Sequence, residues 1–251
     1  MISLSILLLA NTKCEYRSRR QSDLHRDYFK HNVALSTKIN QLQTVAERVW
    51  LPGMIDRNGR KDPILGSIAS DPYALYKYTQ LGSSSNISTI CEVGYNWGAS
   101  SLLWLRANKH AKVFSFDLAE RAYTNITLNW LNTNFKNRLQ LIRGDSALTI
   151  PRFKKSSPDT KCDLIFIDGA HSEQGEFENI VSFQEYATKN TYIILDDCDC
   201  TSNPTSLAYK RALDMQMISH IEAHITTKIY KKSQNFTDLN ERHSFCIGKY
   251  L

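Results

Sequence analysis

Acidic side chains accompany five short apolar segments in the middle of this 251-residue chain. Such segments have the length and composition of strands that are buried on both faces of a parallel sheet. In an open α/β sheet, ligands bind beyond the carboxyl ends of the strands. Carboxylates at that edge can accept hydrogen bonds from a ribose or bind a divalent cation. The acidic residues are Glu92, Asp117, Asp145, Asp168 and the pair Asp196 and Asp197.

Two glycines and an asparagine follow the first apolar segment. Gly94 and Gly98 permit a tight turn from a strand into a helix, with close approach of a ligand to the backbone. Asn96 tolerates a positive φ angle better than most residues. Asp117 follows the second segment, 23 residues after Gly94, where a carboxylate can accept hydrogen bonds from both ribose hydroxyls. The glycine pair by itself is also typical of an ordinary strand-to-helix turn.

Strand and helix patterns alternate from residue 87 onward, and this alternation predicts an α/β fold with a doubly wound sheet. Two consecutive strands, over 218–230 and 244–250, are expected to end the chain. A polar, basic arm over 13–31 and helices over 33–50 and 72–81 are expected before the sheet, and a loop is expected over 151–160. The other expected strands are 87–93, 112–118, 139–143, 162–167 and 192–195, with helices over 99–108, 121–135, 173–188 and 205–217.

Five motifs together resemble the class I S-adenosylmethionine-dependent methyltransferases. Among these, the chain is most similar to the small-molecule O-methyltransferases of the catechol and caffeoyl-CoA type and their relatives. The resemblance implies a Rossmann-like, seven-stranded sheet whose last strand is antiparallel. We therefore expect an N-terminal arm and helical extension over 1–82 and a methyltransferase domain over 83–251. The motifs are EVGYNWGAS (92–100), FSFD (114–117), RGDS (143–146), DLIFIDGAH (163–171) and IILDD (193–197).

The resemblance implies an enzyme that transfers a methyl group from S-adenosylmethionine to a hydroxyl oxygen of a small molecule. Asp117 would hold the ribose of this cofactor, and Asp145 with Ser146 would border its adenine. The other cofactor-binding positions, around the methionine part, would be Glu92, Gly94, Asn96, Gly98 and Ser100.

The resemblance also implies a divalent cation, held by Asp168, Asp196 and Asp197. Three hard oxygen donors suit Mg²⁺ or a similar ion. The third of these positions is commonly Asn in the family, whereas this chain has Asp197. His171 stands where the family commonly has a lysine as general base. A histidine, with an unperturbed pKa near ~6.5, can accept a proton at neutral pH, so His171 and Asp168 are the predicted catalytic residues. A structural loop histidine is the alternative for His171.

Three other functions are weighed against this one. A non-catalytic cofactor-binding module with the same fold would explain the replaced lysine. A nicotinamide-dependent dehydrogenase is disfavoured because the glycines are spaced GxxxG rather than GxGxxG. A nucleic-acid methyltransferase is disfavoured because residues 168–171 read DGAH instead of an Asn-Pro-Pro-Tyr-type sequence. We expect a small hydroxylated substrate and no nucleic acid; the identity of the acceptor and the oligomeric state stay open.

The distribution of charge agrees with a cation-binding site. The net charge of the chain is +6, yet residues 159–199 hold ten acidic and two basic residues, which gives −8. The remainder of the chain therefore sums to +14. A segment so acidic favours a cation over a polyanion as its partner.

The six cysteines are too sparse for a disulfide scaffold, and no pair of CxxC motifs suggests a zinc site. Cys91 and Cys162 lie in apolar runs and are predicted to be buried thiols. Cys198 and Cys200 form a CxC sequence that is predicted to hold two loop thiols.

The apolar run over residues 2–10 is too short for a membrane span, which needs roughly 20 residues. It resembles the core of a signal peptide but lacks a basic segment before it. Asn86, Asn125 and Asn235 each begin an N-glycosylation sequence, a triplet that is common by chance. We expect a cytoplasmic protein, with the secretory pathway as the alternative.

Overall fold

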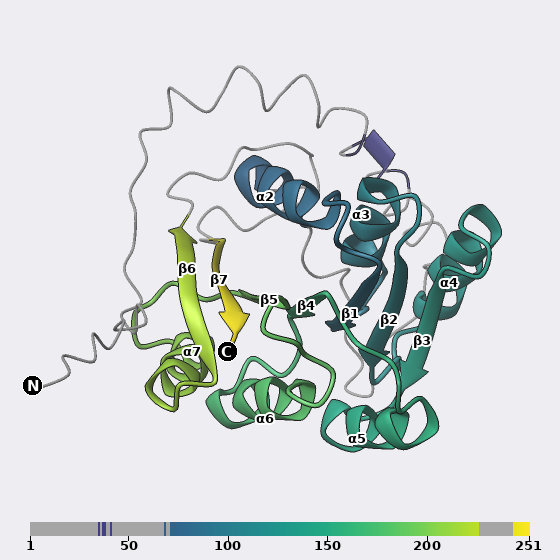
Figure 1. Cartoon of the computed structure of the whole chain (residues 1–251). Coiled ribbons are helices and arrows are strands. Elements are labelled where there is room, and N and C mark those ends of the chain that lie inside the picture. The colour runs from purple at the N-terminus through teal and green to yellow at the C-terminus, as the bar shows by residue number, and fades with distance from the viewer. Residues whose placement is uncertain (1–34, 36, 39–40, 42–67, 69–70, 226–242) are drawn as a thin grey trace, which may run out of the picture.

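A computed structural model describes residues 35, 37–38, 41, 68, 71–225 and 243–251. The arm predicted over 13–31, and nearly all of the helix predicted over 33–50, lie outside these residues. The strands form one seven-stranded sheet in the order β3-β2-β1-β4-β5-β7-β6 (Figure 1). Their bounds are β1 (Thr89–Val93), β2 (Lys112–Asp117), β3 (Leu139–Arg143), β4 (Leu164–Ile167), β5 (Tyr192–Asp196), β6 (Ile218–Ile225) and β7 (Ser244–Tyr250).

Strands β1 to β5 are parallel, and β7 runs antiparallel to both β5 and β6. The doubly wound sheet with an antiparallel last strand is thus confirmed. Strand order reverses between β1 and β4, because the chain first winds outward to β3 and then returns to β4. Such a reversal opens a crevice at the carboxyl ends of the two strands, which is where open α/β sheets bind ligands.

Helices cover the two faces of the sheet as separate layers (Figure 1). One layer comprises α2 (Pro72–Gly82), α3 (Ala99–Ala107) and α4 (Thr124–Asn134). The other comprises α5 (Ser146–Ser156), α6 (Glu173–Phe183) and α7 (Pro204–Asp214). Each layer closes its own hydrophobic core against alternate side chains of the strands. No helix in the described part of the chain combines the length and apolarity needed to cross a bilayer.

Helix α2 begins at an N-cap that also belongs to the candidate site. The Asp71 carboxylate accepts hydrogen bonds from the backbone N–H groups of Tyr73 (2.8 Å) and Ala74 (3.2 Å). A proline follows the cap, at a position where its missing N–H costs nothing. The buried side chains of Leu75 and Tyr78 then pack α2 into the same core as α3, so this helix is anchored over the sheet.

The loop predicted over 151–160 is wrong for its first half, which belongs to α5. Pro151 disfavours a helix at this place, because a proline inside a helix removes one hydrogen bond. The helix forms nevertheless, since Ile150 and Phe153 are buried between it and the sheet. Tertiary packing thus outweighs the local preference of a single residue.

Cys91 and Cys162 are buried as predicted, but the prediction that the cysteines are free thiols is wrong. Cys91 is disulfide-bonded to Cys162, and Cys198 is disulfide-bonded to Cys246. Cys200 is likewise in a disulfide, so no described cysteine is a free thiol. Sequence spacing gave no sign of these bonds, because strand pairing brings together cysteines that are 71 and 48 residues apart.

Candidate active site

The turn after β1 locks three strand ends together. Gly94 has a φ of 97°, and a Cβ atom there would lie 1.9 Å from the main-chain oxygen of Asp168. The Gly94 N–H donates to the Phe116 carbonyl at 2.9 Å, and the Asp168 N–H donates to the Val93 carbonyl at 3.0 Å. Only glycine fits this position. The ends of β1, β2 and β4 are therefore held in fixed register beside the crevice.

Asp117 and Asn96 meet at the ends of β1 and β2. The Asp117 carboxylate accepts the N–H of Asn96 at 2.9 Å and the N–H of Ala119 at 2.5 Å. Asn96 has a φ of 49°, and its side-chain oxygen accepts the Tyr123 hydroxyl at 2.7 Å. These contacts fix the orientation of a partly exposed carboxylate at the sheet edge. Two predicted cofactor-binding residues are thus in direct contact.

Glu92 lies beneath this turn and is fully buried. Its carboxylate accepts hydrogen bonds from the Ser101 hydroxyl and from the Trp104 indole N–H, the latter at 3.1 Å. Burial raises the pKa of Glu92, and the hydrogen bond from Ser101 offsets part of the rise. The side chain joins β1 to α3 and is closed to solvent, as Ser100 nearly is. Both residues therefore support the turn from below.

The remaining predicted cofactor residues lie at helix starts. Gly98 is the N-cap of α3 with a φ of 84°. Asp145 is the exposed N-cap of α5, where its carboxylate accepts the N–H of Ala147 at 3.0 Å, and Ser146 is the first residue of that helix. Sequence reasoning overlooked two exposed apolar side chains nearby, Leu118 (61% exposed) and Leu148 (55% exposed). They follow the neighbouring strands β2 and β3.

A second group of side chains gathers at the ends of β4 and β5. His171 lies between two carboxylates: its Nε2 is 3.8 Å from an oxygen of Asp168, and its Nδ1 is 3.5 Å from an oxygen of Asp197. One ligand atom from each of the three residues lies within 4.8 Å of the others. All three side chains are between 35% and 56% exposed. The cluster is therefore accessible to a ligand and could hold a metal ion.

The backbone of this cluster is held in an uncommon conformation. His171 and Asp197 have φ values of 47° and 55°, which non-glycine residues seldom adopt. The His171 N–H donates to the buried Glu176 carboxylate at 2.9 Å. The Asn203 side-chain amide donates to the Asp197 carbonyl at 2.8 Å. Neighbouring helices thus fix both residues, and strain held in this way is often found at functional sites.

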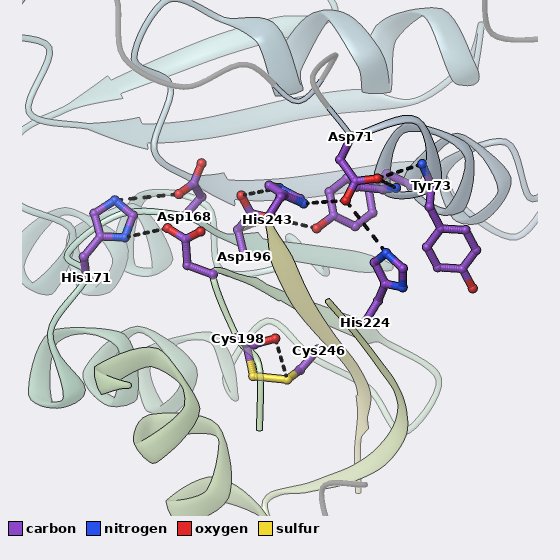
Figure 2. A network of polar contacts seen from close by, with 12 residues as sticks. Asp71, Tyr73, Asp168, His171, Asp196, Cys198, His224, His243 and Cys246 are labelled. Atoms are coloured by element: carbon purple, nitrogen blue, oxygen red, sulfur yellow. Dashed lines mark hydrogen bonds and ion pairs between the residues drawn. A yellow bond between two sulfur atoms is a disulfide. The ribbon is translucent and has the colours of Figure 1, made fainter. Parts of the chain in front are cut away.

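Asp196 lies beside the cluster but has different partners (Figure 2). Its carboxylate accepts the Tyr78 hydroxyl at 2.7 Å and lies 3.2 Å from Nε2 of His243. The other nitrogen of His243 is 3.1 Å from the Asp71 carboxylate. Burial would lower the pKa of His243, but attraction and hydrogen bonding to Asp196 and Asp71 outweigh it and raise the pKa well above its usual value. A largely buried cation therefore joins two carboxylates.

Asp168 experiences the charges of both groups. Partial removal from water raises the pKa of its carboxyl, and repulsion from Asp196 and Asp197 raises it further, to well above its usual value. Attraction to His243 lowers the pKa of Asp168 and offsets part of this rise. Such a concentration of like charge favours a cation or a proton at the cluster.

The structure thus brings the predicted residues into two neighbouring groups. Asn96 and Asp117 form one, and Asp168, His171 and Asp197 form the other. Sequence reasoning missed the network of Asp71, Tyr78 and His243 around Asp196. Tyr78 lies in α2, Asp71 is the N-cap of that helix and His243 precedes β7, and no local motif marks them.

The comparisons with known proteins agree with this geometry. Residues 91–198 match the model of a family described as a methyltransferase domain. No curated protein matches the chain. Together with the fold, the family match supports a methyltransferase domain, and the predicted resemblance to class I S-adenosylmethionine-dependent methyltransferases is confirmed.

Solved structures of methyltransferases are similar to this chain in fold. An O-methyltransferase from Bacillus cereus in complex with SAH has 14% identity and a TM-score of 0.58, with 87% of this chain and 91% of that chain covered. A candidate caffeoyl-CoA O-methyltransferase from Staphylococcus aureus has 16% identity and a TM-score of 0.53, with 88% and 98% covered. A candidate RNA methyltransferase from Pyrococcus horikoshii has 13% identity and a TM-score of 0.51, with 84% and 99% covered. The chain spans about half (48%) of TrmN from Thermus thermophilus.

Proposed function

We propose that this chain transfers the methyl group of S-adenosylmethionine to a hydroxyl oxygen of a small molecule, using residues 83–251, with residues 1–82 as an N-terminal extension. One observation carries this proposal. The main chain of Gly94, in the turn expected to bind the cofactor, packs directly on Asp168, in the cluster expected to bind the acceptor. The two substrates would therefore meet across a fixed contact, as in-line transfer requires.

The cofactor is assigned to the ends of β1, β2 and β3. Asp117 would accept both ribose hydroxyls, since its carboxylate is already oriented by two backbone N–H groups. Gly94, Asn96 and Gly98 would present the main chain to the methionine part, with Glu92 and Ser100 supporting them from below. Asp145 and Ser146 would border the adenine, whose faces the exposed Leu118 and Leu148 could cover.

His171 is assigned as the general base. It would take the proton of the acceptor hydroxyl while the acceptor oxygen forms a bond to the methyl carbon and the bond from that carbon to the sulfonium breaks. Asp168 and Asp197 would stabilise the resulting imidazolium, since each lies within 4 Å of a ring nitrogen. The side chain of His171 is exposed, so an acceptor hydroxyl can reach it.

A divalent cation would bind at this cluster through two of the three ligands that the resemblance implies. Asp168 and Asp197 would hold it, because Mg²⁺ commonly uses one or two carboxylates and keeps several waters. Asp196, the third ligand implied by the resemblance, has its carboxylate directed at Tyr78 and His243. When bound, the cation would lower the pKa of an acceptor hydroxyl.

A small-molecule acceptor is favoured over RNA on electrostatic grounds. The carboxyl ends of β4 and β5, which would face the acceptor, carry the carboxylates of Asp168, Asp196 and Asp197. A polyanion would be repelled from this edge, whereas a neutral or cationic hydroxylated compound would not.

Calorimetric titration with S-adenosylmethionine, followed by incubation with a panel of hydroxylated compounds and with tRNA, tests the proposal. We expect binding of one cofactor per chain and methylation of a small hydroxylated compound but not of tRNA. The absence of binding at millimolar cofactor by folded protein would refute the proposal. Binding without any turnover would favour the non-catalytic module instead.

The base is tested by His171→Asn, with His110→Asn as the matched control. His110 is exposed at the start of β2, away from the carboxyl edge. We expect His171→Asn to retain cofactor affinity and to lower kcat by about 10²–10⁴-fold, which is typical of general base loss. Equal activity of the two variants would contradict the role of His171.

A further inference from the structure

Two disulfides lie inside the second hydrophobic core, beneath α5, α6 and α7. Cys91 to Cys162 and Cys198 to Cys246 have Cα–Cα distances of 5.9 and 5.3 Å, which are ordinary for the bond. All four side chains are fully buried. Each bond joins neighbouring strands or their adjoining loops, at the β1–β4 and β5–β7 pairings. The oxidised cysteines are thus part of the folded sheet.

Such bonds indicate where the chain folds. Each disulfide forms when two thiols give up two protons and two electrons to an oxidant, for which a disulfide-carrying oxidoreductase is the usual source. Disulfides persist in secretory and extracellular compartments and are rare in the cytosol. No described cysteine remains reduced. The structure therefore favours the secretory alternative over the cytoplasmic expectation.

An exposed glycan acceptor sequence accompanies these bonds. Asn86 is exposed in the turn between α2 and β1, and Ser88 two residues later is exposed as well. The turn lies at the amino end of β1, whereas the candidate active site lies at the carboxyl ends of the strands. A glycan on Asn86 would therefore project from the edge opposite to the active site.

The N-glycosylation sequence that begins at Asn125 has a different environment. Asn125 lies in α4, and its side-chain oxygen accepts a hydrogen bond from Arg143 at 2.6 Å. Thr127, the third residue of that triplet, is fully buried and bonded to the Tyr95 hydroxyl. Asn235 lies outside the described residues. Among the described sequences, Asn86 is thus the better acceptor.

We propose that this chain folds in an oxidising secretory compartment and carries an N-linked glycan on Asn86. In this modification, Nδ2 of Asn86 bonds to the anomeric carbon of a pyrophosphate-linked lipid oligosaccharide. The bond from that carbon to the pyrophosphate breaks, the lipid pyrophosphate leaves, and the amide loses one proton. The inference is independent of methyl transfer, because neither the disulfides nor Asn86 belongs to the proposed catalytic residues.

The test is expression of the full chain in cultured eukaryotic cells that are lysed in a thiol-blocking reagent. Mass is compared before and after treatment with an endoglycosidase that removes N-linked glycans. We expect Asn86→Gln to lose one glycan relative to the native chain, while Asn125→Gln and the sequon-preserving Ser88→Thr keep it. Non-reducing peptide maps should contain the Cys91–Cys162 and Cys198–Cys246 cross-links.

Two results would overturn the proposal. One is that endoglycosidase treatment lowers the mass of the native chain and of Asn86→Gln by the same amount, or lowers neither. The other is recovery of the four cysteines as blocked thiols from the native chain. Because the Asn86 side chain is exposed, Asn86→Gln should fold, and retention of the native thermal unfolding midpoint verifies this.

Discussion

The two halves of the carboxyl edge are built by different means. At the ends of β1 and β2, the site is formed mainly by the main chain. The turn at Gly94 packs on the residue that follows β4, and backbone N–H groups orient Asp117. At β4 and β5, charged side chains dominate, and their partners arrive from α2 and β7. The first half, which we propose binds the cofactor, is thus held by main-chain contacts. The second is a balance of charges, in which a cation or proton can be exchanged.

The largest effect is expected from Gly94→Ala in the main-chain half. Its Cβ would lie 1.9 Å from the Asp168 carbonyl oxygen, in a residue with a φ of 97°, so the strand ends must move apart. We expect a loss of about 4–5 kcal/mol in the free energy of unfolding and no detectable cofactor binding. Denaturant unfolding and calorimetry measure both.

Gly144→Ala is the control for this prediction. It also has a positive φ, of 124°, but its Cβ would meet only a side-chain methyl group, at 3.1 Å. Only the cost of the φ angle, about 1–3 kcal/mol, should remain. Equal destabilisation by the two variants would mean that the contact with Asp168 is unimportant.

The next largest effect is expected from His243→Gln in the side-chain half. Removal of the cation leaves the Asp71 and Asp196 carboxylates, which are 2% and 12% exposed, facing each other. We expect a loss of about 3 kcal/mol in unfolding free energy, at the lower end for a broken buried ion pair.

The difference in unfolding free energy between the native protein and His243→Gln should depend on pH. The pKa of His243 is raised in the folded chain. Its stabilisation is therefore complete below the pKa of an unfolded histidine, about 6.5, and is lost as the pH rises through the higher folded value. Unfolding free energies of native protein and His243→Gln should thus converge at alkaline pH. A constant difference across that range would show that the histidine is not a cation.

An intermediate effect distinguishes the carboxylates of the side-chain half. Asp168→Asn and Asp197→Asn should each weaken Mn²⁺ or Mg²⁺ binding by about tenfold or more, equivalent to about 1.4 kcal/mol. Asp196→Asn should weaken it less than threefold, because its carboxylate is directed at Tyr78 and His243. Direct metal titration provides the measurement, with exposed Asp159→Asn as the control. An equal loss of affinity in all three variants would restore the ligand set of the resemblance.

The smallest effect concerns an exposed position of the main-chain half. Asp145→Ala removes the N-cap of α5 and should lower the unfolding free energy by about 1 kcal/mol. Asp145→Asn keeps a capping oxygen and should change the unfolding free energy by only a few tenths of a kcal/mol. If both variants lose the same stability, the negative charge rather than the cap is responsible.

The same contrast explains how far the sequence could be interpreted. The strands over 139–143 and 244–250 were predicted with their observed bounds, because each contains a short apolar run. The contact of Asn96 with Asp117 also follows from a local motif at the ends of neighbouring parallel strands. A site formed by the main chain can be predicted from sequence, because its positive φ angles require residues such as glycine and asparagine.

The side-chain half was less predictable. His243 reaches Asp196 only because β7 inserts between β5 and β6, and no spacing in the sequence encodes that approach. The disulfides depend on the same pairings. Helix α5 was missed for a related reason, since burial of Ile150 and Phe153 offsets the effect of Pro151. Contacts between distant segments therefore limit what a single sequence can predict.

Calorimetric titration of S-adenosylmethionine into native protein, Asp117→Asn and His171→Asn tests the central claim most directly. The account predicts one site per chain in the native protein and in His171→Asn. Loss of the charged hydrogen-bond acceptor should weaken binding in Asp117→Asn by about 10- to 100-fold. Folded native protein that releases no heat with millimolar cofactor, or Asp117→Asn with native affinity, would contradict the assignment of the β1–β2 edge to the cofactor.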